Sequence, residues 1–327
     1  MKRIIFIFLL SGLSIAAYNQ TIRGTVFDKD TKAIINFASI YFNGTVTGTA
    51  TDGKGNFELD VSKYNTMPLT ISAIGYYSET LTDFSSAKPY IIFLSPKVFE
   101  LSEVVVSSKA HDRERKYNMK LFRNEFLGAT ANASECEIRN EEEIRFLYET
   151  EGEILTGFAS KPIIIDNKAL GYVITYYLDK FEYNKIKDTF LFKGNIIFKD
   201  SLTTEDQQRQ LLNRRAAYMG SRMHFFRTLW SGDIKSAGYT VENKDQDYLK
   251  IKDIVINTAN NTKALKYPGE LIICYNMLYT SRAIFFKNSV YFDKNGYYDP
   301  AGISWEGEMA RYRIADELPL EYSLTNQ

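Results

Sequence analysis

Five strand-length runs of β-branched and aromatic residues stand near the start of the chain and limit what this part of it can fold into. Turn-forming residues separate the runs, as at Asn43-Gly44 and at Asp52-Gly53-Lys54-Gly55-Asn56. Several short strands at this spacing are typical of a β-sandwich, in which two sheets pack face to face. The sequence therefore predicts strands at residues 21–28, 37–42, 56–61, 69–74 and 90–94.

The same segment carries a series of short motifs. Gly24-Thr25-Val26 comes first, Ala38-Ser39-Ile40 follows, and Ile74-Gly75-Tyr76 comes last, with a Gly-rich turn at residues 48–57 between them. This series resembles the carboxypeptidase-like regulatory domain of Bacteroidetes envelope proteins, which also stands at the front of TonB-dependent transporters. The resemblance implies a seven-stranded prealbumin-like β-sandwich over residues 21–98. It implies a scaffold and no reaction.

Residues 1–20 have the layout of a secretory signal peptide. Lys2 and Arg3 precede an apolar run at residues 4–13, and small residues follow at 14–17. The alternative is a membrane anchor, but the run is shorter than the ~20 apolar residues that span a bilayer. We expect cleavage and export across the inner membrane, to the periplasm or the outer membrane. We expect no transmembrane span in the mature chain.

The charge balance argues against nucleic acid as a partner. The chain has 40 Lys and Arg residues and 40 Asp and Glu residues, so it has no net field to attract a polyanion. Its 327 residues are enough for two domains, each with a core of its own.

Cys136 and Cys274 are the only cysteines of the sequence. An oxidising compartment would permit a disulfide between them. The alternative is two separate buried thiols. We favour the thiols, because Cys274 lies in an apolar run that is typical of the core of a strand.

Residues 99–116 are expected to link the two domains. They include Leu101-Ser102-Glu103-Val104-Val105-Val106, which resembles the segment before the plug of TonB-dependent transporters. Such an extended run can pair with the sheet edge of a partner or with a strand of its own chain, and we favour the second. The roughly 220 residues that follow are fewer than a plug and a large barrel need, so we do not expect a transporter.

The second domain, residues 117–327, is predicted to mix strands and helices. Met119, Phe122 and Phe126 have helical spacing and predict a helix over residues 117–127. A second helical region begins near Thr204, and Gly220 is expected to split it. An apolar stripe is expected along that region at Leu212, Ala216, Met219, Met223, Phe226 and Trp230. Strands are predicted at residues 144–150, 154–159, 163–165, 171–181, 190–198, 271–277 and 283–292. The predicted fold class is mainly β, a β-sandwich followed by a β-rich α+β domain.

Three stretches of the second domain also resemble a known group of proteins. They run from Glu125 to Asn140, from Pro162 to Ile174 and from Asn213 to Arg227. They are similar to the C-terminal region of uncharacterised Bacteroidetes proteins that are named only for their N-terminal domain. That resemblance implies no activity and no catalytic residues.

Two residue patterns suggest a metal, and we expect neither to bind one. His111-Asp112-Arg113-Glu114 has the His-x-x-Glu spacing of zinc carboxypeptidases, with His224 as a third ligand. It stands, however, in a charged linker rather than at the end of a strand. Asp52, Asn56 and Glu58 offer oxygens to calcium, but a Gly-rich turn of this kind normally only reverses the chain. No metal and no other cofactor is predicted.

Other signals of an enzyme are weaker. Ser85-x-x-Lys88 has the letters of a hydrolase motif, but the partner motifs of that family are absent from the sequence. The acidic run Glu141-Glu142-Glu143 is expected to be a solvated turn. We therefore predict that the protein is not an enzyme.

The best candidate for binding is a polar patch on the second helical region. Its members are Asn213, Arg214, Tyr218, Ser221, His224 and Arg227. Helical spacing places Arg214, Tyr218 and Ser221 near one face, with the last two members on the turns beyond. Such a face could bind a carboxylate or phosphate through arginine, or a sugar through tyrosine and arginine. The alternative is that these side chains hydrogen-bond the adjoining sheet and hold the helix in place.

These observations predict a non-enzymatic protein of the cell envelope, a module that binds or assembles protein or glycan. An accessory component of a TonB-linked outer-membrane uptake system is the first alternative. A hydrolase of unknown substrate is the second. The sequence leaves the ligand and the oligomeric state open.

Overall fold

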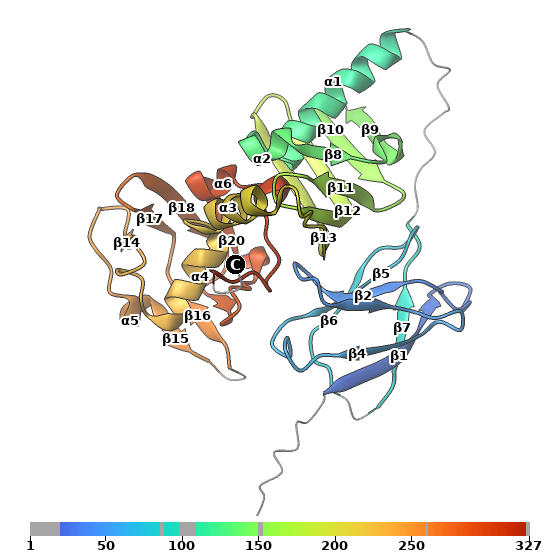
Figure 1. Ribbon diagram of the computed structural model, residues 1–327, viewed down its shortest axis with the longest axis horizontal. Coiled ribbons are helices and arrows are strands. Elements are labelled where there is room, and N and C mark those ends of the chain that lie inside the picture. Colours follow the sequence, from blue (N-terminus) through green and yellow to red (C-terminus); the bar gives the residue numbers. More distant parts are fainter. Residues whose placement is uncertain (1–19, 86–87, 98–108, 150–152, 259–260, 325–327) are drawn as a thin grey trace, which may run out of the picture.

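The computed structural model describes residues 20–85, 88–97, 109–149, 153–258 and 261–324. These residues build three hydrophobic cores, one in the N-terminal sandwich, one under a six-stranded sheet and one in the C-terminal part. In Figure 1 the three parts surround the end of the chain. The expected signal peptide lies outside the described residues, except for its last position. The same is true of most of the expected linker, including the run from Leu101 to Val106.

The N-terminal part is the predicted β-sandwich. Its two sheets have the strand orders β4-β1-β7 and β3-β2-β5-β6. All five predicted strands are present. Strands β1 and β4 have the period-two alternation that buries one face, whereas β2 and β5 are buried along most or all of their length. The sequence pattern missed two strands of three residues, which are too short to show alternation. The strands are β1 (Thr21–Asp28), β2 (Ser39–Phe42), β3 (Gly48–Ala50), β4 (Asn56–Asp60), β5 (Leu69–Ser72), β6 (Glu79–Leu81) and β7 (Tyr90–Leu94).

The middle part is a six-stranded antiparallel sheet covered by a long helix. The strands follow the order β8-β11-β12-β10-β9, and β13 pairs with β12 as well. Helix α1 packs Phe122 and Phe126 against the sheet, where their rings contact Phe181 and Tyr176. The elements are α1 (Lys109–Phe126), α2 (Ala131–Ser134), β8 (Cys136–Ile138), β9 (Ile144–Glu149), β10 (Ile154–Ala159), β11 (Ile163–Asn167), β12 (Tyr172–Asn184) and β13 (Thr189–Asp200).

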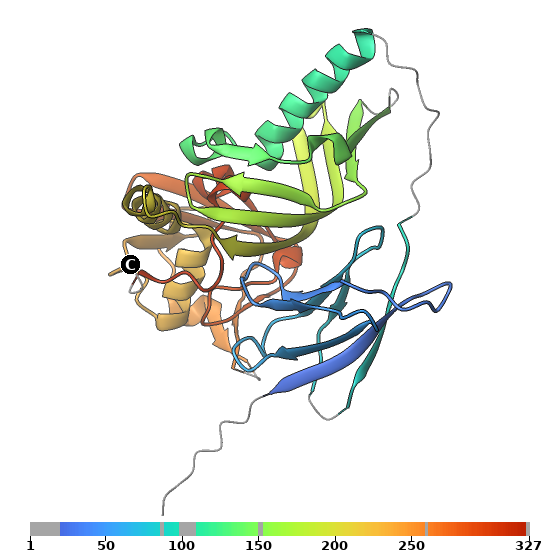
Figure 2. The same ribbon diagram turned by 45° about the vertical axis from the view of Figure 1, so that its right-hand side comes forward.

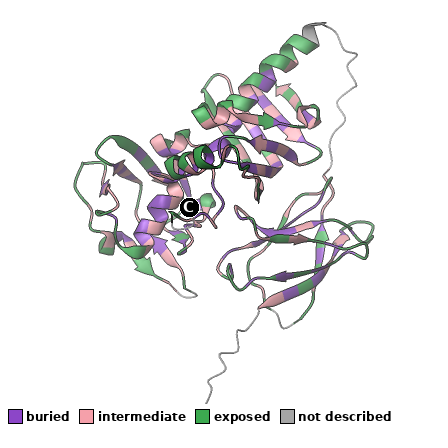
Figure 3. Ribbon diagram, in the orientation of Figure 1, coloured by how far each residue is buried: buried purple, intermediate pink, exposed green. Residues whose placement is uncertain are grey.

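Helix α1 begins earlier than the sequence pattern indicates. The helix was expected over residues 117–127, yet it starts at Lys109, within the segment expected to be a linker. Residues 112–116 have no apolar face to reveal a helix, and they project into solvent with mostly exposed side chains (Figure 3). Their Arg, Glu and Lys residues favour helix on propensity alone.

The C-terminal part packs helix α4 against two small sheets, with orders β14-β17-β18-β20 and β15-β16-β19. The single strand expected at residues 283–292 is wrong. It is two strands in different sheets, because the amides of Phe286 and Lys287 turn aside to the carbonyl of Gly302. The elements are α3 (Gln207–Tyr218), α4 (Arg222–Ser231), β14 (Tyr239–Glu242), α5 (Ile251–Ile254), β15 (Val255–Asn257), β16 (Lys263–Leu265), β17 (Glu270–Tyr275), β18 (Tyr279–Phe285), β19 (Val290–Phe292), β20 (Ile303–Gly307) and α6 (Glu308–Arg311).

The break between α3 and α4 corrects the expected apolar stripe. Gly220 has a φ of +82°, so the two helices do not share one axis and their faces are out of register. Leu212 is 62% exposed and Ala216 is exposed as well, although both belong to the expected stripe. Helix α3 instead buries Gln210, Arg214, Ala217 and Tyr218.

The sandwich is joined to the middle sheet by the loop between β2 and β3. Thr45 forms a parallel bridge with Ile197 of the edge strand β13, and the carbonyl of Thr45 accepts the amide of Phe198 at 2.9 Å. Beside this bridge the ring of Tyr41 stacks on that of Tyr177. The loop thus extends a sheet of the other part, as a strand from a partner would.

A segment near the end of the chain, residues 312–322, touches all three parts and is called the strap below. In both ribbon views it runs between the sandwich and the helices (Figures 1 and 2). The amide of Leu320 donates to the carbonyl of Gly44, and the Glu321 carboxylate accepts the amide of Val46 and the hydroxyl of Thr47. The strap therefore holds the sandwich in place.

Two further expectations concern the membrane and the cysteines. Among the helices that the structure describes, none is long and apolar enough to span a bilayer. Cys136 and Cys274 are both free thiols, on strands of different sheets. Burial raises the pKa of Cys136 to about 12, so this thiol stays protonated and unreactive at neutral pH.

Candidate binding site

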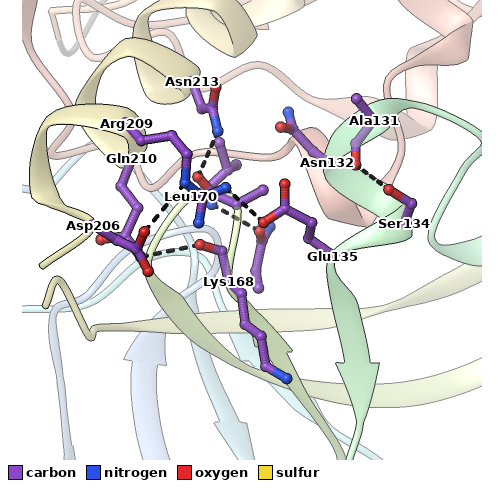
Figure 4. A network of polar contacts seen from close by, with 12 residues as sticks. Ala131, Asn132, Ser134, Glu135, Lys168, Leu170, Asp206, Arg209, Gln210 and Asn213 are labelled. Carbon is purple, nitrogen blue, oxygen red and sulfur yellow. Dashed lines mark hydrogen bonds and ion pairs between the residues drawn. The ribbon is translucent and has the colours of Figure 1, made fainter.

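The first members of the predicted patch fasten α3 to the turn between β11 and β12. Four successive carbonyls of that turn, those of residues 168–171, each accept a hydrogen bond from an α3 side chain. Gln210 donates to the first, Asn213 to the second and Arg214 to the last two. Figure 4 shows the part of this contact nearest α2, where Arg209 also pairs with Glu135 and Asp206. These side chains satisfy backbone acceptors that α3 covers.

Arg214 has a dense set of contacts. It is 5% exposed, its Nε lies 2.6 Å from the carbonyl of Leu170, and its guanidinium also pairs with Asp200 at 3.1 Å. The guanidinium carbon lies 3.7 Å from the centre of the Tyr172 ring, which adds a cation–π contact. Its nitrogens are bonded to the carbonyls of Leu170 and Gly171 and to the carboxylate of Asp200.

Ser221 and His224 form the start of α4. Ser221 is the N-cap residue, and its hydroxyl accepts the amide of His224. The His224 Nδ1 lies 3.2 Å from the amide of Gly220 and 3.1 Å from the hydroxyl of Tyr239. The amide can only donate, so Nδ1 is the unprotonated nitrogen of the ring. The imidazole thus supports the helix break.

Protonation of His224 is expected to destabilise the fold in acid. Burial, and then the nearby Arg227, lower the pKa of His224 from 6.5 to about 4. The unfolded chain takes up the proton near pH 6.5, whereas the folded chain does so only at about pH 4. The free energy of unfolding should therefore fall by about 2 kcal/mol as the pH drops from 7 to 4.5.

A His224→Phe variant isolates this effect, because the other charged or phenolic groups around the ring remain. These are Arg227, Tyr218, Tyr239 and Tyr275. Urea titrations should find the advantage of the wild type over the variant smaller at pH 4.5 than at pH 7. An equal difference at the two pH values would contradict this prediction.

Arg227 and Tyr218 hold the strap. Arg227 donates to the carbonyls of Tyr322, Leu320 and Asn295 at 2.8, 3.0 and 2.9 Å. The Tyr218 ring packs on that of Tyr322, with centroids 5.2 Å apart. The six patch residues therefore lie in two places, at the β11–β12 turn and around the helix break, and both sets bond mainly to backbone. This geometry favours the alternative in which the patch holds the helices.

Residues of the other two resembling stretches, 125–140 and 162–174, also bond to the strap. Thr130 and Asn132 both donate to the carboxylate of Asp316 in the strap. Asn167 donates to the carbonyl of Ala315 and accepts the amide of Leu170. In these resembling stretches, Thr130, Asn132 and Asn167 therefore have a structural role, which is to attach the strap.

A pocket of about 280 Å³ opens beside the helix break. It lies between the start of the α3–α4 turn, the hairpin of β17 and β18, and α6. Gly220 forms part of its wall, where a Cβ atom would come within 2.9 Å of the Tyr275 ring. The lining residues are Ala216, Met219, Gly220, Tyr275, Asn276, Tyr279, Ser281, Glu308, Met309 and Tyr312.

The tyrosines of this pocket are supported from behind. The Tyr275 ring packs on Tyr239 at 4.8 Å and meets His224 edge-on at 5.8 Å. Tyr279 lies 6.5 Å from Tyr275 with an interplanar angle of 27°, and it is 48% exposed. Burial, and then Glu308, raise the pKa of Tyr312, so its phenol stays protonated at neutral pH.

Three other hollows among the described residues are less suited to bind a ligand. A hollow beside Arg222 and Glu317 has a volume of only about 20 Å³, enough for about one water molecule. Two larger ones, of about 400 and 450 Å³, lie at the β17–β18 sheet and on the sandwich. Arg23 and Glu58, which form an ion pair, line the sandwich hollow, and neither of the two hollows is lined by three aromatic residues.

The sequence pattern does not predict this pocket, although the predicted polar patch lies on the helices beside it. One signal was available: the hairpin tip carries Met277 and Leu278, which are 90% and 77% exposed, between Tyr275 and Tyr279. Two tyrosines around an exposed apolar turn suggest a surface feature. The residues of α6 that complete the pocket carry no comparable signal.

The residues of the two metal patterns have other partners. Asp52 accepts the amides of Lys54 and Asn56, which closes the turn, and Glu58 pairs with Arg23. The backbone of His111 belongs to α1, but its side chain lies outside the described residues, as do two residues of the Ser85–Lys88 motif. Within the described ranges no three His, Cys, Asp or Glu side chains gather as metal ligands would.

Two residues of the acidic run form ion pairs. Glu141 pairs with Arg123, and Glu143 pairs with Lys161.

Comparisons with known proteins concern mainly the sandwich. Residues 22–106 match the family model of the CarboxypepD_reg-like domain. A search of curated proteins found no match. Among solved structures, a candidate membrane-associated protein of unknown function from Bacteroides fragilis matches with 11% identity and a TM-score of 0.18, over 88% of this chain and 94% of that one. A TM-score this low carries no argument. The matched residues include nearly all of the sandwich from β1 to β7, so the N-terminal part of this chain is similar to the CarboxypepD_reg-like domain.

Proposed function

We propose that this chain is a non-enzymatic binding protein of the cell envelope, with its ligand site in the tyrosine-lined pocket. The observation that carries the proposal is the convergence of Tyr275, Tyr279 and Tyr312 on one pocket of about 280 Å³. Small-molecule sites of proteins are concave, rich in aromatic side chains and supplied with a few polar groups. This pocket has all three properties.

Binding is favoured over catalysis by the roles of the polar groups nearby. A catalytic site needs a nucleophile, acid or base that can reach a substrate. His224 is buried and bonds to Gly220 and Tyr239, and the guanidinium groups of Arg214 and Arg227 bond to carbonyls. The polar groups of these three residues therefore bond to the protein itself and stabilise the fold.

The CarboxypepD_reg-like domain is proposed to act as a scaffold. It contributes no residue to the lining of the pocket, and it is fixed to the rest of the chain through Thr45 and the strap. Because it packs against the middle sheet, it is proposed to keep the pocket in a defined orientation relative to the sandwich. The proposed location in the envelope rests on the signal peptide expected from the sequence.

Filling the pocket tests this proposal. Ala216 is exposed on α3 and lines the pocket, so an Ala216→Trp variant should block it without burying a large side chain in the core. Immobilised wild-type protein should retain a protein or glycan fraction of a bacterial envelope extract about tenfold better than the variant does.

The matched control is Leu212→Trp, one turn away on the same helix and outside the pocket. It should retain the same fraction as the wild type. Equal retention by the wild type and by Ala216→Trp would contradict the proposed function.

A further inference from the structure

We infer that the ligand of the pocket is a neutral glycan, with one sugar ring lying on the exposed face of Tyr279. This inference rests on the proposed function and names the class of ligand. It is carried by the charge, the aromatic faces and the hydrogen-bonding groups of the pocket.

The charge of the pocket disfavours ionic ligands. Glu308 is the only charged residue among the ten that line it, and no Lys or Arg is among them. An anion such as a phosphate or a carboxylate would have no cation to bind. Glu308 already pairs with Arg311 at 3.0 Å, so a cationic ligand would have to compete with a partner that is present. A neutral ligand meets neither obstacle.

The aromatic faces suit a ligand with a flat apolar side. Tyr279 is half exposed, and Tyr275 behind it lies nearly parallel. The ring of Tyr279 is thus held in place before a ligand arrives, which lowers the entropy lost on binding. A sugar ring presents C–H groups on its face and hydroxyls at its edge, so it can stack on tyrosine and still form hydrogen bonds.

The polar groups of the pocket are of the kinds that bind hydroxyls. The phenol of Tyr312 can both donate and accept, and the exposed amide of Asn276 has two donors and an acceptor. The carboxylate of Glu308 has a second oxygen, Oε1, beside the one that contacts Arg311. Met219 and Met309 add apolar side chains to the same lining.

The walls of the pocket are pre-formed. The backbone amide of Asn276 donates to the carbonyl of Gly238, and the backbone amide of Met309 donates to the hydroxyl of Ser281. The hairpin and α6 are therefore fastened to neighbouring elements. The volume of about 280 Å³ is near the lower end of small-molecule sites, about 300–1,000 Å³. It suits the end of a glycan chain rather than a large cofactor.

The test is a binding assay with defined probes. Isothermal titration is carried out with neutral gluco-, manno-, xylo- and galacto-oligosaccharides, and with a trimethyl-lysine peptide as the cationic probe. The wild type should bind at least one neutral oligosaccharide. Tyr279→Ala should weaken that binding about fivefold to tenfold, whereas Tyr279→Phe should keep most of it because the ring remains.

The matched control is Tyr248→Ala, which removes a tyrosine that is 74% exposed and outside the pocket. Its affinity should equal that of the wild type. Equal affinity of Tyr279→Ala and the wild type would overturn the inference, as would the absence of binding to every neutral oligosaccharide.

The two proposals fail in different ways. If the wild type binds the trimethyl-lysine peptide and not the sugars, and Tyr279→Ala loses the peptide, the glycan inference is overturned while the pocket remains a binding site. If instead the wild type binds none of these probes and Ala216→Trp retains envelope fractions as well as the wild type does, the proposed function fails too.

Discussion

Replacing Arg214 with methionine is expected to lower the free energy of unfolding by about 3 kcal/mol. The substitution keeps the length of the side chain and removes its donors. The carbonyls of Leu170 and Gly171 then stay buried under α3 without hydrogen-bond partners. Asp200 is 52% exposed on its side chain and can be rehydrated, so most of the loss should come from the two carbonyls and from the contact with Tyr172.

The control for this prediction is Arg215→Met. Arg215 is the next residue of α3 and is exposed, so its replacement should change stability by less than about 0.5 kcal/mol. Urea unfolding followed by circular dichroism measures both variants. A loss below about 1 kcal/mol in Arg214→Met would contradict the structural role of this residue.

Replacing Arg227 with methionine is expected to cost a similar amount, about 3 kcal/mol, and to loosen the strap. Three carbonyls lose the donor that now reaches them, two of them in the strap. Because Leu320 is bonded to Gly44 of the sandwich, the effect should extend to the sandwich contact. Hydrogen exchange should show faster exchange of the Leu320 amide, as expected for local opening.

Lys294→Met is the control for this second variant. Lys294 is exposed and adjoins Asn295, whose carbonyl accepts from Arg227. Its replacement should leave the exchange of the Leu320 amide unchanged. Unchanged exchange in Arg227→Met as well would show that the strap does not depend on this arginine.

The sequence predicts much of the sandwich and less of the rest, for physical reasons. The limits of β1 and β7 match the predicted residues 21–28 and 90–94, because strands with one buried face show alternation directly. The charged start of α1 shows no such pattern, since residues 112–116 have no apolar side chain to bury. The segment around Phe286 reads as a continuous strand, although the carbonyl of a residue far along the chain, Gly302, diverts it.

The candidate site shows a different limit. The sequence predicts the polar patch at residues 213–227, but whether its arginines face solvent or the protein depends on what packs against each helix: the β11–β12 turn for Arg214 and the strap for Arg227. The pocket beside it is built from residues 216–220, 275–281 and 308–312. Nothing local in the sequence shows that these three segments meet, because tertiary packing alone brings them together.

The central claim is that the patch holds the fold and the pocket binds the ligand. Affinity for the best-bound oligosaccharide and free energy of unfolding, measured together in Tyr279→Ala and Arg214→Met, test it most directly. Tyr279→Ala should lose affinity and keep stability, whereas the folded Arg214→Met protein should keep affinity and lose about 3 kcal/mol of stability. Loss of binding by a stable Arg214→Met protein, with wild-type affinity in Tyr279→Ala, would contradict the account.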